Sequence, residues 1–149
     1  MVALFDDQPA LRRPLGITLL AALYLFFLLV SASTFGNPCP FFGRICFGTA
    51  AKFLVLTDSL LCLYLFLGVL QRQVLTWYML LGYNLLQIGN TVYNLHFIPL
   101  AEIEAVTGGQ IQKDALWTNN MIAALGMLLL TQYIFRHKRY FANGARYLF

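Results

Sequence analysis

Four long apolar runs, separated by short polar connectors, dominate the pattern of this chain. Each run is close to the roughly 20 helical residues that cross ~30 Å of hydrocarbon, and each contains few charged residues. We therefore expect an all-α fold, an antiparallel four-helix transmembrane bundle built from a single domain over residues 1–149. The predicted helices span residues 15–33, 49–70, 74–95 and 117–135.

The third run differs from the others because its polar residues fall within about 120° of arc on a helix. A membrane helix with one polar stripe cannot face lipid all round, so we expect this stripe to meet other helices or enclosed water. The stripe consists of Thr76, Tyr83, Asn84, Gln87, Asn90, Thr91 and Asn94.

The connectors carry residues that end helices. Residues 34–48 are rich in glycine and proline, and residues 71–73 form a tight polar turn. The connector over residues 96–116 is the longest, with a short surface helix expected over residues 101–106 and a turn at Gly108-Gly109.

Composition excludes an ordinary soluble domain, since 60% of the residues are hydrophobic and only 11% are charged. The net charge of +4 does not predict nucleic-acid binding, because the basic residues lie next to apolar runs and there set membrane orientation. Both termini and the 71–73 turn are therefore predicted in the cytoplasm, with the two longer connectors outside. The basic residues on the predicted cytoplasmic side are Arg12, Arg13, Arg72, Arg136, Lys138, Arg139 and Arg146.

Asp58 is the only acidic residue well inside a predicted span, where a lone carboxylate costs on the order of 2.5–3.5 kcal/mol. Polar residues of the other spans lie at matching depth in the outer half of the bundle. They predict either a pocket for a small solute, ion or proton, or a hydrogen-bonded core network that fixes helix register. The candidate ligand-binding residues are Asp58, Gln87, Asn90, Thr91, Asn94 and Asn120.

Cys39 and Cys46 lie in the first predicted outer connector, where an oxidising environment favours a disulfide. The alternative is a redox-active pair. The four-span plan resembles that of thiol–quinone oxidoreductases, but this chain has no Cys-x-x-Cys and no cysteine in its second outer connector. Cys62 is expected to be a small apolar filler.

No catalytic triad, phosphate-binding glycine loop or metal-ligand pattern occurs, so we expect no cofactor and no metal, and a non-enzymatic protein is favoured. The first functional hypothesis is an accessory or interaction subunit of a membrane assembly. Gly82 and Gly89, on a helix face distinct from the polar stripe, mark the expected contact with a protein partner or a second copy. The binder or carrier of a small solute, ion or proton is the second hypothesis, and a thiol-disulfide redox protein is the third.

The opening residues Arg13 to Thr18 resemble the start of several small bacterial membrane proteins. This resemblance covers only the first span and implies no activity. We expect an integral protein of a bacterial inner membrane.

Overall fold

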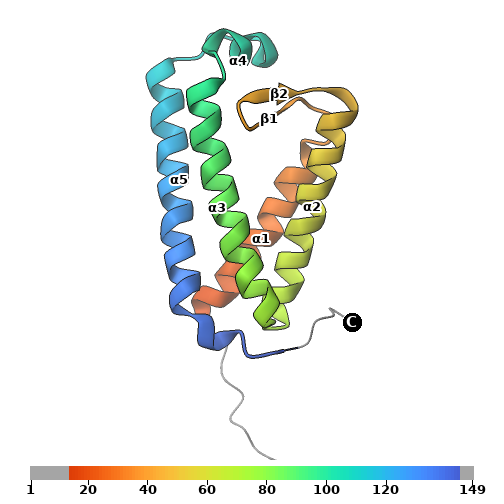
Figure 1. Cartoon of the computed structure of the whole chain (residues 1–149), viewed down its shortest axis with the longest axis vertical. Coiled ribbons are helices and arrows are strands. Elements are labelled where there is room, and N and C mark those ends of the chain that lie inside the picture. The colour runs from red at the N-terminus through yellow and green to blue at the C-terminus, as the bar shows by residue number, and fades with distance from the viewer. Residues whose placement is uncertain (1–13, 145–149) are drawn as a thin grey trace, which may run out of the picture.

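The computed structural model describes residues 14–144, and this part of the chain is mostly helical. Four long helices are joined by a hairpin of two short strands, a tight turn and the short helix α4 (Figure 1). The elements are α1 (Leu15–Ser33), β1 (Cys39–Phe41), β2 (Arg44–Cys46), α2 (Gly48–Leu70), α3 (Val74–Phe97), α4 (Leu100–Thr107), α5 (Lys113–Arg136) and the 3-10 helix η1 (Lys138–Tyr140).

The long helices occupy the four predicted runs, and their ends have local causes. α3 continues to Phe97 and stops there because Ile98 precedes a proline and is extended. α5 begins at Lys113, earlier than predicted, with Asp114 in its first turn where the helix dipole favours an acid. The short surface helix is present as α4, and Gly108 ends it in a left-handed conformation.

Helices α1 and α2 pack as one pair, and α3 and α5 pack as another (Figure 1). The two pairs meet near the 71–73 turn, here called the turn end, and diverge toward the strands, here called the hairpin end. Close approach at the turn end depends on two glycines. A side chain at Gly16 would collide with Tyr133 of α5, and one at Gly68 would collide with Thr76 of α3.

The hydrophobic core lies at the turn end. Each of the four long helices contributes a fully buried side chain to it, and these are Tyr24, Leu65, Leu80 and Ile134. Burial of such side chains contributes about 1.5–3 kcal/mol each in water. The hairpin end lacks an equivalent cluster among residues 14–144, which leaves room there for a cavity.

A β-hairpin closes the hairpin end, where the sequence predicted only a connector. Its two-residue turn, Phe42-Gly43, has positive φ at both positions, +42° and +78°, as a type I′ turn requires. The strands are three residues long and carry no alternating pattern that would predict them.

The chain that follows α5 fastens the turn end. The backbone N–H of Val74 donates to the Asn143 carbonyl at 2.9 Å, and that of Asn143 donates to the Arg72 carbonyl at 3.0 Å. The Arg72 guanidinium lies 4.6 Å from the ring centre of Tyr140. These contacts hold the 71–73 turn and the start of α3 against the segment that follows α5.

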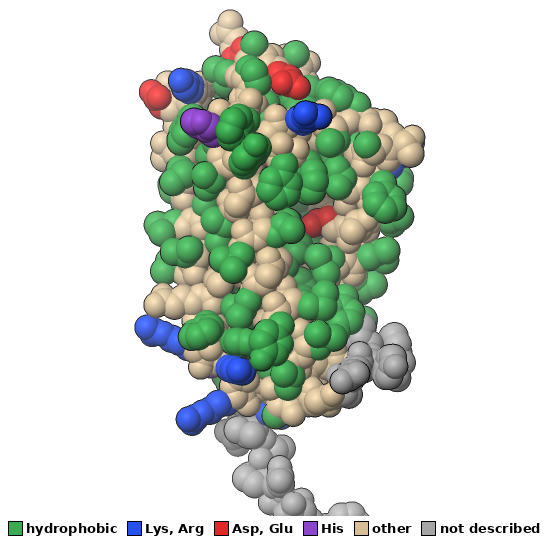
Figure 2. Space-filling view, in the orientation of Figure 1, with side chains coloured by type: hydrophobic (Ala, Val, Ile, Leu, Met, Phe, Trp, Pro, Cys, Tyr) green, Lys and Arg blue, Asp and Glu red, His purple; other side chains and the backbone are tan. Residues whose placement is uncertain are grey.

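Two of the helices, α1 and α2, are long and apolar enough to cross a membrane. Figure 2 shows hydrophobic side chains over the middle of one face of the molecule, with basic side chains at both ends. An acidic side chain is visible in a hollow of this otherwise apolar region.

Candidate functional site

A cavity of about 880 Å³ lies between the two helix pairs, beneath the hairpin. All four long helices and β1 contribute to its walls, which are mainly apolar. Among the described residues, Asp58 is the only Asp, Glu, Lys, Arg or His whose side chain lines it. This volume lies within the range of about 300–1,000 Å³ typical of small-molecule sites.

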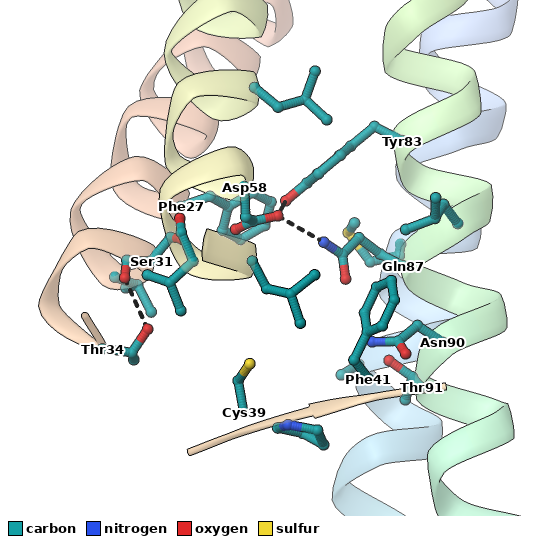
Figure 3. A pocket seen from close by; sticks show the side chains of 18 of the residues that line it. Phe27, Ser31, Thr34, Cys39, Phe41, Asp58, Tyr83, Gln87, Asn90 and Thr91 are labelled. Atoms are coloured by element: carbon teal, nitrogen blue, oxygen red, sulfur yellow. Dashed lines mark hydrogen bonds between the residues drawn. The ribbon is translucent and has the colours of Figure 1, made fainter. Parts of the chain in front are cut away.

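Asp58 projects from α2 toward α3, where two side chains one helical turn apart bind the same carboxylate oxygen (Figure 3). The Tyr83 hydroxyl donates to Asp58 Oδ1 at 3.0 Å, and Gln87 Nε2 donates to it at 3.1 Å. Within residues 14–144, the second oxygen, Oδ2, has no hydrogen-bond partner. The carboxylate is therefore held in place through one oxygen, while the other is available to accept a hydrogen bond.

Tyr83 extends this network from Asp58 to a second residue of α2. Its hydroxyl lies 3.3 Å from the sulfur of buried Cys62. Because the Tyr83 hydroxyl donates its hydrogen to Asp58, the Cys62 thiol is the donor to Tyr83. Cys62 was predicted only as an apolar filler, so its contact with the polar network is a finding of the structure.

Asn90 and Asn94 bind the hairpin. The backbone N–H of Phe42 donates to Asn90 Oδ1 at 2.8 Å, and that of Gly43 donates to Asn94 Oδ1 at 2.7 Å. Asn94 Nδ2 also donates to Asn90 Oδ1, at 3.2 Å. Both asparagine oxygens therefore accept hydrogen bonds from the backbone N–H groups of the hairpin turn. Asn90 also lines the cavity, and its Nδ2 has no partner within residues 14–144.

The remaining predicted ligand-binding residues lie in different places. Thr91 lines the cavity beside Asn90. Asn120 does not line the cavity. Its Nδ2 donates to the Leu116 carbonyl of its own helix at 2.8 Å. The structure thus brings Asp58, Gln87, Asn90 and Thr91 to one cavity, places Asn94 above it, and leaves Asn120 outside.

The predicted disulfide is not present in the structure. Cys39 and Cys46 stand opposite each other in the hairpin register, yet both are free thiols. The hairpin is already held by its own strand pairing and by the asparagine side chains of α3, so its closure does not require the bond. Burial raises the pKa of the Cys39 thiol, and the charges of Cys46 and Asp58 raise it further.

Two features of the site were not predicted from the sequence. Aromatic rings of Phe27 and Phe41 form part of the wall, the latter from the unpredicted hairpin (Figure 3). Tyr83 was placed on the polar stripe but not among the ligand-binding residues. Its spacing of four residues from Gln87 is the signal that could have identified it, since such residues share a helix face.

No protein-family model, curated protein or solved structure matches this chain.

Proposed function

We propose that the four long helices all cross a membrane, with the turn end in the cytoplasm. α3 and α5 are each 24 residues long, which at 1.5 Å per residue exceeds the ~30 Å hydrocarbon thickness. The apolar windows of α1 and α2 are only 22% and 28% buried, unlike the core helix of a soluble protein. Basic residues follow α2 and α5 at the turn end, as the positive-inside rule expects of a cytoplasmic side.

The function proposed for this bundle is the binding of a small amphipathic molecule between the two helix pairs. The apolar walls accept its hydrocarbon part, and the open Oδ2 of Asp58 accepts a hydrogen bond from its polar head. The observation that carries this proposal is a carboxylate anchored through one oxygen only, at the wall of a large apolar cavity. Asn90 and Thr91 place further polar groups nearby.

Photolabelling in lipid nanodiscs tests this function. The probe is an aliphatic alcohol whose chain carries a diazirine, and labelled residues are identified by mass spectrometry. We expect labelling to concentrate on apolar residues of the cavity wall, such as Leu61 and Met127. On the outer faces of the helices the probe must compete with lipid, so labelling there should be weak and spread over many residues.

A pair of glycine variants provides the control. A side-chain carbon added at Gly126 or at Gly82 would meet nothing within 4 Å, but only Gly126 lines the cavity. Gly126→Trp should fill the cavity and remove labelling of its walls, whereas Gly82→Trp should leave the labelling unchanged. Uniform labelling of the helices, unaffected by Gly126→Trp, would contradict the proposal.

An accessory role in a membrane assembly is the second candidate. A side-chain carbon added at Gly82 or Gly89 would meet nothing within 4 Å, so this face of α3 is uncovered by the described part of the chain. Small residues on an open face favour close helix–helix contact in lipid. Cross-linking from Gly89→Cys to a second protein or a second copy tests this role, and its absence in native membranes would count against it.

A further inference from the structure

Asp58 has no counter-charge among the described residues. Within residues 14–144 no Lys, Arg or His side chain lines the cavity, and Asp58 forms no ion pair. Its two partners on α3, Tyr83 and Gln87, are neutral hydrogen-bond donors. A charged group in apolar surroundings is costly unless it is paired, so a cation beside Oδ2 would relieve that cost.

The surroundings of that oxygen also suit a cation. The rings of Phe27, Phe41 and Tyr83 line the same cavity, and aromatic faces attract ammonium groups. The hydroxyl of Thr91 and the side-chain carbonyl of Gln87 lie on the wall of the same cavity and offer acceptors for further N–H groups. A carboxylate, aromatic rings and neutral acceptors together select a positively charged head and disfavour an anionic one.

We infer that the molecule bound in this cavity is an amphipathic amine, whose ammonium group pairs with Asp58 and whose hydrocarbon part fills the apolar space. This inference rests on the proposed binding function and adds the charge of the ligand to it. The ammonium donates to Oδ2, the oxygen that Tyr83 and Gln87 leave open. A charge-assisted hydrogen bond in such surroundings is among the stronger ones in proteins.

Competition against the photoprobe measures the charge preference directly. The competitors are octylammonium, octan-1-ol and octanoate, which share one chain and differ only in the head. We expect octylammonium to block labelling of the cavity wall at about tenfold lower concentration than octan-1-ol, with octanoate the weakest. Each value is compared with the same competitor on Asp58→Asn, which corrects for different partitioning into lipid.

Asp58→Asn should weaken labelling of the cavity, because one acceptor oxygen becomes an NH₂ donor. In the labelling that remains, it should remove the preference for octylammonium over octan-1-ol. Glu102→Gln, a change to an exposed acid on α4, should leave the preference intact. If the three competitors act equally on the wild-type protein, or if the preference survives Asp58→Asn, the amine assignment is wrong while cavity binding stands. If the probe never labels the cavity in the wild-type protein, the proposed function itself fails.

Discussion

Polar side chains of α3 form hydrogen bonds with three other elements. Gln87 reaches α2 and orients Asp58, whereas Asn90 and Asn94 reach the turn of the hairpin. Tyr24 of α1 adds a third contact by donating to Asn84 Oδ1 at 2.6 Å, in the buried core. A single stripe of polar residues therefore joins α3 to three other elements, and the cavity lies between the contacts.

Gly68 is the residue whose substitution should disturb this arrangement most directly. A methyl group there would overlap the side chain of Thr76, so Gly68→Ala should separate α2 from α3 and destabilise the protein by about 1–3 kcal/mol. Gly82→Ala is the matched control, since the added carbon meets nothing within 4 Å. Thermal unfolding in a fixed detergent compares the two. Equal transition temperatures for both variants would contradict the close approach of α2 and α3.

At the scale of the elements, apolar runs were sufficient to predict the long helices. The short α4 was expected in the connector between Pro99 and Gly108-Gly109. The inward direction of the α3 stripe also followed from its periodicity. The hairpin did not, because Phe42-Gly43 lacks the usual Asn-Gly or Asp-Gly turn signal and the turn depends on amides from distant Asn90 and Asn94. A pocket around Asp58 was one of the two alternatives that the sequence predicted. The size and apolar walls of the cavity were not predicted, because they require the two helix pairs to diverge from their glycine contacts.

The hairpin register makes a prediction about its cysteines. Glutathione disulfide should oxidise Cys39 and Cys46 to an intramolecular disulfide, as the two thiols lose two hydrogens and two glutathione thiols form. Of three cysteines, only Cys62 should then react with a maleimide after denaturation. The raised pKa of Cys39 predicts faster oxidation as the pH rises, because the attacking species is the thiolate.

Serine variants separate this bond from other oxidation products. Neither Cys39→Ser nor Cys46→Ser can form it, so the intact mass of each variant should show at most an added glutathione and never the loss of two hydrogens. Cys62→Ser should oxidise at the wild-type rate, because Cys62 is buried away from the hairpin register. A disulfide that includes Cys62 would contradict the observed packing.

At the scale of the whole molecule, the two ends of the helical bundle differ in what they contain. The turn end combines the core with basic residues, and there Lys138 lies 4.6 Å from the Trp77 ring centre. The hairpin end combines the cavity with the two longer connectors. The proposed orientation therefore puts the ligand site in the outer half of the membrane.

Single cysteines near the two ends of α5 test that orientation. In a background with the three native cysteines replaced by serine, Lys113→Cys and Arg139→Cys lie on exposed positions at the hairpin end and the turn end. A membrane-impermeant maleimide should label Lys113→Cys in intact bacterial cells expressing the protein. It should label Arg139→Cys only after the cells are permeabilised, because seven of the ten basic residues predict a cytoplasmic turn end. The reverse pattern would invert the topology and put the Asp58 cavity in the cytoplasmic half. Labelling of both positions in intact cells would show instead that α5 does not cross the membrane, which would leave one wall of the cavity outside the bilayer.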